Sequence, residues 1–214
     1  KSTTTALVGH ILRVNGKDVR VGGNIGVGVL DLDKLHGAAI YVLELSSYQL
    51  DLTKSLDCDV GVLLNVTPDH LDRYESFEAY AASKARLFEM QSEGAAVITD
   101  QDEPTRNIVK SLASRPAVAG WFPGAAVGQE QLILWRPEGG RVARPLVIFG
   151  ESPFGQAGWP ALAGPHNAQN AAAAIAACRL LGLVPNQIEL GLRTYPGLPH
   201  RMERIREKDG VLFI

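Results

Sequence analysis

The sequence predicts an α/β fold, with a mostly parallel sheet flanked by helices and a small antiparallel addition. Two apolar runs, AAIYVLEL at 38–45 and CDVGVLLNV at 58–66, have strand length and little polar alternation, which is typical of strands covered on both faces. Helical patterns alternate with these strands, as they do where helices connect parallel strands. After residue 116 the strands become short and are separated by Gly, Pro and charged turns, which indicates antiparallel pairing.

The elements of the first half follow from local patterns. TTTALVGHIL at 3–12 has small and apolar residues at helical spacing, so a helix is expected to begin near Ser2. VRVGGNIGVGV at 19–29 indicates a short strand that runs into a glycine-rich turn. The other elements expected in this half are a helix at 75–90, a strand at 95–100 and a helix at 103–113.

The second half is predicted in the same way. Short strands are expected within 116–122, 131–135 and 144–150, and helices at 166–182 and 187–195. Gly182, followed by Pro185, is a typical helix end. The Pro- and Gly-rich stretch 196–201 indicates a linker, and an Asp-Gly turn within 203–214 predicts a hairpin.

Composition argues against two classes of function. The chain has 214 residues, 46% of them hydrophobic and 21% charged, with a formal net charge of -2. It therefore has no excess of positive charge for nucleic acid or anionic membranes. Cys58 and Cys178 lie far apart in apolar surroundings and are expected to be free thiols in a reducing compartment. Without a long apolar run or a signal peptide, the cytoplasm is the expected location.

The first residues, KSTTT, match the end of a phosphate-binding loop. In the pattern GxxxxGK[ST] the lysine contacts phosphates, the next hydroxyl holds magnesium, and helix amides bind the oxyanions. The glycines of that pattern are not in the sequence, and Ser or Thr at a helix start is also a common N-cap. Lys1, Ser2 and Thr3 are therefore candidates for phosphate binding, with helix capping as the alternative.

Polar side chains follow both apolar strands at their carboxyl ends, where open α/β sheets bind ligands. Glu44 lies in an otherwise apolar strand, where a carboxylate is costly to bury unless it is paired or binds metal. The polar loop NVTPDHLDRY at 65–74 places His70 after the next strand. Either the Glu44 charge reaches solvent, or Glu44, His70 and the Ser2 hydroxyl form a site for divalent metal and phosphate. Because histidine is not a typical magnesium ligand, a second position open to Mn²⁺ as well as Mg²⁺ is expected.

Lys84 lies on the apolar side of the helix expected at 75–90, four residues after Tyr80 and four before Phe88. Either its stem is buried while the ammonium reaches water, or the amine is desolvated and its pKa is lowered. A neutral amine can react with carbon dioxide to give a carbamate, which is an anionic oxygen ligand suited to magnesium.

Asn167 and Asn170 lie three residues apart at the start of the helix expected at 166–182. They either cap the helix or hold an adenine base, whose donor and acceptor edge suits paired amides. Arg201, in the expected linker, either stays solvated or contacts a γ-phosphate.

Taken in order, these segments resemble the Mur ligase family, ATP-dependent amide-forming ligases of peptidoglycan precursor synthesis. The resemblance covers nearly the whole chain and is carried by KSTTT, GGNIG, YVLELSSYQL, LNVTPDHLDRY, SKARLFE, GPHNAQNAAAA and GLPHRME. The most specific part is LELSSYQL after GGNIG, which is similar to the branch of the family that adds D-glutamate to UDP-N-acetylmuramoyl-L-alanine.

The resemblance implies a P-loop NTPase-like central ATP-binding domain at 1–198, expected to lack the first part of its phosphate loop, and the start of a C-terminal ligase domain at 199–214. The ATP-binding residues it implies are Lys1, Ser2, Thr3, Asn167, Asn170 and Arg201. The implied ligands of two magnesium ions are Ser2, Glu44, His70 and Lys84 as a carbamate. The implied substrate contacts are Asn24, Ser46 and His70, and the implied catalytic residues are Lys1, His70 and Lys84.

The implied reaction has two steps. The substrate carboxylate attacks the γ-phosphate of ATP to give an acyl phosphate, and the amine of D-glutamate then displaces phosphate. The resemblance implies a monomeric enzyme of the bacterial cytoplasm, and the 214 residues alone are expected to be inactive. The alternatives are a sister ligase of the family, a folylpolyglutamate synthase-type ligase, or a non-catalytic nucleotide-binding module.

Overall fold

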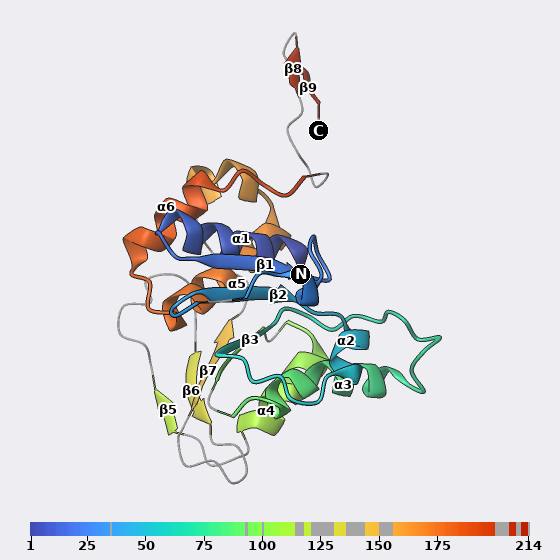
Figure 1. Cartoon of the computed structure of the whole chain (residues 1–214). Coiled ribbons are helices and arrows are strands. Elements are labelled where there is room, and N and C mark those ends of the chain that lie inside the picture. The colour runs from blue at the N-terminus through green and yellow to red at the C-terminus, as the bar shows by residue number, and fades with distance from the viewer. Residues whose placement is uncertain are drawn as a thin grey trace. The chain divides into compact units, whose positions relative to one another are not determined.

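The computed structural model describes residues 1–34, 36–92, 94–99, 101–113, 118–120, 131–135, 144–149, 156–199, 206–208 and 211–213. The chain divides into two compact units, and Figure 1 labels the elements of both. Unit 1 comprises Lys1–Glu44, Gly155–Cys178 and Gly182–Ile214, and unit 2 comprises Leu45–Phe154 and Arg179–Leu181.

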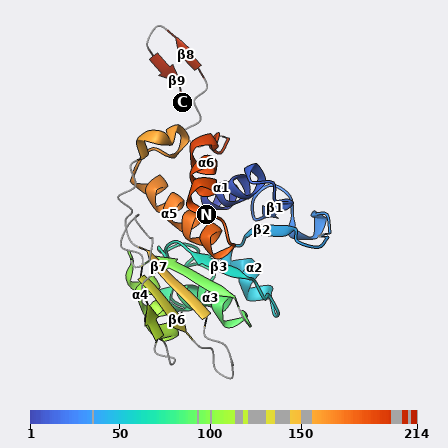
Figure 2. The same cartoon turned by 90° about the vertical axis from the view of Figure 1, so that its left-hand side faces the viewer.

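Unit 1 is built around a pair of parallel strands. β1 (Val19–Gly23) pairs with β2 (Ile40–Glu44), in a register that runs from Val19 opposite Ile40 to Gly23 opposite Glu44. α1 (Ser2–Val14) packs on both strands and on α6 (Pro185–Thr194). Figures 1 and 2 both show α1 beside α6. This unit also contains α5 (Pro165–Leu180), of which the part up to Cys178 belongs to unit 1, and the strands β8 (Arg206–Lys208) and β9 (Val211–Phe213). Three 3-10 turns complete it within the described residues, at Val29–Asp31, Gln156–Gly158 and Pro160–Leu162.

Two glycines let α1 approach its neighbours closely. A Cβ on Gly9 would lie 2.4 Å from Cγ2 of Val21 in β1, and one on Gly191 of α6 would lie 2.6 Å from Cγ1 of Ile11. The side chains of α1 that face this packing, Leu7, Ile11 and Leu12, have no exposed surface. Tight packing on both sides therefore fixes the direction of α1, and its N-cap residue, Lys1, lies beside Glu44 at the carboxyl end of β2.

Unit 2 contains a five-stranded sheet within the described residues, in the order β3-β4-β7-β6-β5. The strands are β3 (Val60–Leu63), β4 (Ala95–Thr99), β5 (Val118–Gly120), β6 (Gln131–Trp135) and β7 (Arg144–Phe149). β4 pairs in parallel with β3 and β7, whereas β6 pairs antiparallel with β7 and β5. The helices of this unit are α2 (Ser47–Leu52), α3 (Phe77–Glu89) and α4 (Glu103–Ala113).

The core of unit 2 lies where α3 and α4 pack on the parallel part of the sheet. β4 is buried along its whole length, as expected for a strand covered on both faces. The buried side chains of this core are Leu63, Val66, Tyr80, Phe88, Ala96, Ile98, Ile108 and Leu112. Phe88 is 1% exposed and fills the space above Gly61, where a Cβ would lie only 3.1 Å from the ring.

The predicted α/β class and the alternation of helices and strands are confirmed, and three features differ from the prediction. The short helix α2 was not expected. The strands at 19–23 and 40–44 form a sheet of their own among the described residues. The strand at 144–149 was expected to be antiparallel, but it pairs in parallel with β4 on one side, because tertiary packing rather than local pattern selects a strand's neighbours.

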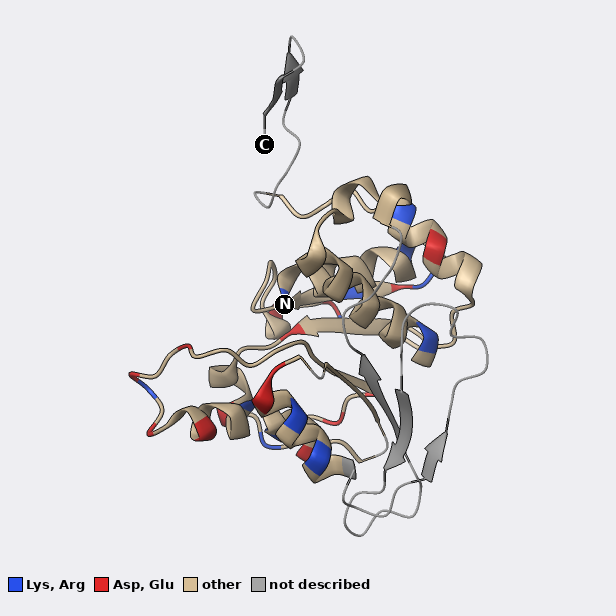
Figure 3. Cartoon of the chain, turned by 180° about the vertical axis from the view of Figure 1, so that it is seen from behind, with Lys and Arg blue, Asp and Glu red and all other residues tan. Residues whose placement is uncertain are grey.

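The hairpin expected at 203–214 is present as the antiparallel pair β8 and β9, while its Asp-Gly turn lies outside the described residues. In Figure 3 the described helices and loops carry both acidic and basic residues. Among the described helices, none combines the length and the apolar character needed to cross a membrane.

Candidate functional site

Glu44, the last residue of β2, is the centre of a polar cluster in unit 1. Its side chain is only 3% exposed, and its Oε1 lies 3.4 Å from Nζ of Lys1. The same oxygen accepts a hydrogen bond of 3.2 Å from Nδ2 of Asn24. Oε2 is buried and has no hydrogen-bond partner in the described part of the chain. Lys1, Ser2, Asn24 and Glu44 are called the Glu44 cluster below.

The glycine-rich turn after β1 brings Asn24 onto Glu44. Gly23 has φ +105°, and a Cβ there would lie 2.3 Å from the carbonyl oxygen of Glu44, so only glycine fits. The turn is closed by the amide of Gly23, which donates to the carbonyl of Val27 at 2.8 Å, and by Gly26 with φ +65°. The backbone of Asn24 then donates to the carbonyl of Glu44 at 2.7 Å, which places the two side chains together.

The surroundings of Glu44 keep it ionised. Burial by itself would raise the pKa of Glu44, but hydrogen bonds from Ser2 and Asn24 and the charge of Lys1 outweigh burial, so the pKa lies below its ordinary value. A buried, ionised oxygen without a partner is a suitable ligand for a hard cation such as Mg²⁺. No group of three or more His, Cys, Asp or Glu suited to a metal occurs among the described residues. A cation at Glu44 would therefore need oxygen ligands from a phosphate or water, as is usual for magnesium.

The N-terminus of α1 is suited to an anion. Lys1 occupies the N-cap position without a side-chain cap, and the first turn contains no acidic residue. The free amide groups of a first turn and the helix dipole attract negative charge. Ser2 and Thr3 lie on this turn, so the structure places all three predicted phosphate-binding residues at one helix end.

Asn167 and Asn170 lie on the first turns of α5 and are linked to α1. Oγ1 of Thr4 donates to Oδ1 of Asn170 at 2.9 Å, and Nδ2 of Asn170 donates to Oδ1 of Asn167 at 3.1 Å. Nδ2 of Asn167 donates in turn to the carbonyl of Ala163 at 3.0 Å. These four residues are called the asparagine relay below. Part of the amide capacity of both asparagines is therefore used within the protein.

His70 in unit 2 has an unusual backbone conformation. Its φ is +53°, and its amide donates to Oδ1 of Asp69 at 2.9 Å. The imidazole Nε2 lies 3.4 Å from Oδ2 of Asp69, and the ring contacts Tyr48 at 4.8 Å between centroids. Left-handed φ values in non-glycine residues are uncommon and are often found at functional sites. The His70 side chain is 45% exposed and so accessible to a ligand.

Lys84 of α3 lies on the face of Tyr80, with Nζ 4.5 Å from the ring centroid. Burial lowers the pKa of Lys84, and the nearby charge of Asp69 opposes this effect only in part. The ring of His70 also meets Tyr80, edge to face at 6.5 Å. Two predicted site residues, His70 and Lys84, are thus brought to the same tyrosine.

Hydrogen bonds and ring contacts fix the loop that carries His70. The hydroxyl of Tyr74 donates to Oδ2 of Asp51 at 2.6 Å, and it lies 3.2 Å from Oγ of Ser83. The guanidinium of Arg73 stacks over Tyr48 at 4.2 Å. The loop is therefore attached to both α2 and α3.

Two predicted residues gain no functional evidence from the geometry. Ser46 is the N-cap of α2 and forms a capping box with Gln49, whose amide donates to Oγ of Ser46 at 3.2 Å. Its role in substrate binding stays a prediction. Arg201 lies outside the described residues.

The sequence prediction did not include Thr4 and Tyr80 among the site residues. Thr4 is 5% exposed and shares a helix face with Leu7 and Val8, so its hydroxyl needed an internal partner. Tyr80 precedes Lys84 by one helical turn. A buried polar group on an apolar stripe was the available signal for Thr4, but its partner is 166 residues away in sequence.

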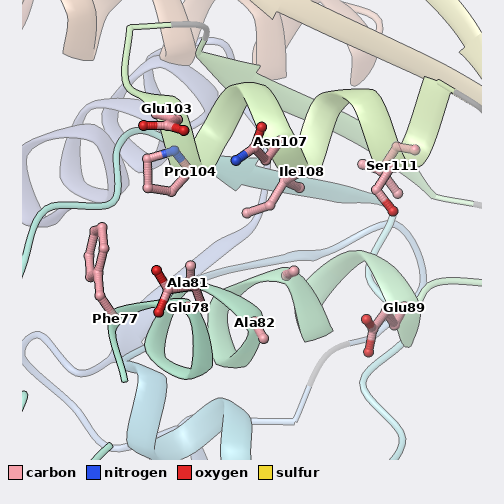
Figure 4. A pocket seen from close by; sticks show the side chains of 12 residues that line it. Phe77, Glu78, Ala81, Ala82, Glu89, Glu103, Pro104, Asn107, Ile108 and Ser111 are labelled. Carbon is pink, nitrogen blue, oxygen red and sulfur yellow. The ribbon is translucent and has the colours of Figure 1, made fainter. Parts of the chain in front are cut away.

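A groove lies between α3 and α4 in unit 2, and none of the predicted site residues lines it. It has a volume of about 370 Å³ and is shown in Figure 4. Phe77, Ala81 and Ile108 supply apolar surface, while Glu78 of α3 and Glu103 of α4 lie at the same end of the groove. The groove therefore lies apart from the residues for which the sequence predicts chemistry.

The sequence matches the Mur ligase middle domain family over residues 1–178. It is 47% identical over 212 residues to the UDP-N-acetylmuramoylalanine--D-glutamate ligase of Sphingopyxis alaskensis, covering 99% of this chain and 43% of the relative. It is 45% identical over 221 residues to the ligase of the same name from Caulobacter vibrioides, covering 100% of this chain and 45% of that relative. The chain thus spans less than half the length of these relatives.

Solved structures of similar fold are also ligases. One is a UDP-N-acetylmuramoylalanyl-D-glutamyl-2,6-diaminopimelate--D-alanyl-D-alanyl ligase from Acinetobacter baumannii, with a TM-score of 0.61, 22% identity and coverage of 98% of this chain and 47% of that one. Another is a UDP-N-acetylmuramate-alanine ligase from Thermotoga maritima, with a TM-score of 0.58, 21% identity and coverage of 98% and 46%. At these identities the likeness concerns the fold alone.

Proposed function

The chain belongs to the Mur ligase middle domain family, and on this premise we propose that it is the ATP-binding segment of a ligase that adds D-glutamate to UDP-N-acetylmuramoyl-L-alanine. The observation that carries the proposal is the Glu44 cluster. There a buried carboxylate with one unpartnered oxygen lies beside a lysine at a helix N-terminus that has no acidic residue in its first turn. The two relatives compared above, at 47% and 45% identity, support the choice of D-glutamate through their names.

The Glu44 cluster is proposed to bind the phosphates of ATP and their magnesium ion, with Asn24 at its edge assigned to the muramoyl substrate. Lys1 and the first amides of α1 supply positive charge to the β- and γ-phosphates, and Ser2 and Thr3 lie on the same turn. Ser2 and Oε2 of Glu44 would hold a magnesium ion, which supplies charge neutralisation for the phosphates. Two anions must meet in this reaction, so Lys1 lowers the repulsion between the attacking carboxylate and ATP.

The chemistry proceeds in two proposed steps. An oxygen of the substrate carboxylate forms a bond to the γ-phosphorus, the bond to the bridging oxygen breaks, and ADP leaves with that electron pair. The amine of D-glutamate then attacks the acyl carbon, inorganic phosphate leaves, and the ammonium proton passes to solvent or a base. Asn24, Ser46 and His70 are proposed to contact the UDP-muramoyl substrate, and Asn167, Asn170 and Arg201 to contact the nucleotide.

Lys84 and His70 are proposed to hold a second metal ion, Mg²⁺ or Mn²⁺, with Lys84 as a carbamate. The lowered pKa of Lys84 supports this, because only a neutral amine attacks carbon dioxide. We further expect a monomer that acts in the bacterial cytoplasm, where ATP and both other substrates are soluble.

The proposal is tested in a chimera in which this chain replaces the matching segment of the Sphingopyxis alaskensis ligase. We expect D-glutamate-dependent release of ADP and phosphate, and we expect Glu44→Gln to lower kcat by about 100-fold or more, because the neutral amide loses the charge that faces the cation. The matched control is Glu103→Gln, which changes an exposed glutamate at the start of α4. Full activity of the Glu44→Gln chimera would contradict the proposal.

The same assay separates the alternatives. Activity with L-lysine, diaminopimelate or L-glutamate on a folate in place of D-glutamate would indicate a sister ligase or a folylpolyglutamate synthase-type enzyme. A chimera that binds ATP but releases no ADP with any amino acid, and in which Lys84→Ala changes nothing, would indicate a non-catalytic nucleotide-binding module.

A further inference from the structure

The asparagine relay joins the first turn of α1 to the start of α5, two elements far apart in the sequence. We propose that Thr4 is a positioning residue for the nucleotide, which acts by orienting Asn170 and, through Asn170, Asn167. This inference rests on the proposed function, because it assumes that the phosphate end of ATP lies at α1 and that the asparagines face the nucleotide.

The hydrogen bonds of the relay can point in one direction only. A backbone carbonyl accepts and never donates, so Asn167 must turn its Nδ2 toward Ala163. Its Oδ1 therefore faces Asn170, which must donate with its own Nδ2. That leaves Oδ1 of Asn170 turned toward α1, where the hydroxyl of Thr4 must be the donor. The carbonyl of Ala163 thus sets the orientation of both amides.

The relay runs from the interior toward the surface. Thr4 is 5% exposed and its bond to Asn170 is partly buried, whereas the bond from Asn167 to Ala163 is exposed. An amide has two N–H groups and two acceptor lone pairs on its oxygen. Within the described part of the chain, Asn167 therefore keeps one N–H and one lone pair for a ligand, in a fixed orientation. By the same count Asn170 also keeps one N–H and one lone pair, so it can orient Asn167 and contact the nucleotide itself.

Thr4 connects this orientation to the phosphate end. It lies in the first turn of α1, three residues after the N-cap residue Lys1, and residues at this spacing are neighbours on the helix surface. Replacing Thr4 by valine keeps the shape and removes the donor, which leaves Oδ1 of Asn170 in partly buried surroundings without its partner. The relay then loses its inner attachment, and Asn167 must be ordered when the nucleotide binds.

The test compares Thr4→Val with Thr4→Ser in the chimera with the Sphingopyxis alaskensis ligase. We expect Thr4→Val to raise KM for MgATP by about 3- to 10-fold, the range of one lost hydrogen bond, with kcat and KM for D-glutamate changed by less than about twofold. Thr4→Ser keeps the hydroxyl and should restore KM. Thr5→Val, one residue further on the same helix, is the matched control and should leave KM unchanged.

A thermodynamic cycle keeps the inference testable even if Thr4→Val folds poorly. The effects of Thr4→Val and Asn170→Ala on MgATP binding, measured by calorimetry below the unfolding temperature of every variant, should be non-additive because both break one relay. Additive effects, equal KM values for the Val and Ser variants, or equal losses in kcat and in KM for every substrate would overturn the inference. An unmodified chimera that does not bind MgATP would instead reject the proposed function.

Discussion

At the scale of single residues, Glu44 and Lys84 show how one direction of pKa shift has opposite effects on charge. Hydrogen bonds and Lys1 outweigh burial at Glu44, so its lowered pKa keeps the carboxylate charged. Burial dominates at Lys84, so its lowered pKa favours the neutral amine. The first group has the property that a cation ligand needs, and the second has the property that carbamate formation needs.

We predict that Lys84 takes up carbon dioxide at a lower pH than an exposed lysine, whose pKa is about 10.4. The nitrogen lone pair forms a bond to the carbon of carbon dioxide and the nitrogen releases a proton, so uptake rises with pH as the neutral fraction rises. NMR with isotope-labelled carbon dioxide should show a side-chain carbamate signal that grows with pH, apart from the signal of the α-amino group, whose pKa is about 8. Lys84→Arg should remove this signal, whereas Lys110→Arg, at an exposed position on α4, should retain it.

The proposed role of a Lys84 carbamate in catalysis is tested separately, by measuring kcat. In the chimera, Lys84→Ala should lower kcat by about 10- to 100-fold, the usual effect of losing a group that supports a metal site. Short carboxylic acids should restore part of the activity of Lys84→Ala, because they supply the missing anionic oxygens. If the alanine variant keeps full activity, the carbamate has no catalytic role.

At the scale of elements, the placement of α1 depends on the glycine of α6 that faces it. We predict that Gly191→Ala destabilises the chain. Alanine gains about 1 kcal/mol in helix propensity, but its Cβ would lie 2.8 Å from the Cα of Ile11, and backbone cannot yield as a side-chain end can. Overpacking typically costs about 1–3 kcal/mol, so the clash outweighs the gain.

Urea denaturation of the full chain measures this effect. The midpoint should fall for Gly191→Ala, and Gly158→Ala is the control because its Cβ would meet nothing within 4 Å. Equal midpoints for the two variants would show that α1 and α6 can separate slightly without cost.

Local pattern predicted most of the elements, and its failures have physical reasons. The helices at 77–89 and 103–113 and the strands at 40–44 and 95–99 lie within the predicted ranges. Burial of one helix face imposes a period on the sequence, and burial of both strand faces gives a continuous apolar run. α2 has only six residues, too few for a period, although the Ser46 and Gln49 capping pair was a signal for it. Strand 144–149 has neighbours on both sides that no local pattern specifies.

The candidate site was predictable where it follows from topology and not where it depends on single contacts. Glu44 was expected because parallel strands carry ligands at their carboxyl ends. The bond from Asn24 to Glu44 depends on the register of β1 with β2 and on the φ of Gly23, and sequence specifies neither directly. The bond from Thr4 to Asn170 joins elements 166 residues apart and could not be derived from spacing.

At the scale of the whole molecule, the proposed roles divide between the two compact units. Lys1, Ser2, Glu44, Asn167 and Asn170, which are proposed to serve ATP, belong to unit 1. Ser46, His70 and Lys84, which are proposed to serve the second metal and the muramoyl substrate, belong to unit 2, whereas Asn24, the remaining proposed substrate contact, belongs to unit 1. The division implies that ATP, bound without the other substrates, should stabilise mainly unit 1.

We therefore predict that MgATP slows amide hydrogen exchange in α1, in the turn after β1 and in the first turns of α5, and has a smaller effect on α3. A ligand at 100 times its Kd stabilises the state that binds it by about 2.7 kcal/mol, which slows exchange through unfolding of unit 1 by about 100-fold. Mass spectrometry of the chimera with and without MgATP measures this. Lys1→Ala should abolish the protection, because the phosphates lose their lysine, whereas Lys110→Arg should preserve it. Protection confined to α3 and the loop of His70 would place the nucleotide in unit 2 and would contradict the assignment of Lys1, Glu44 and the asparagine relay to ATP.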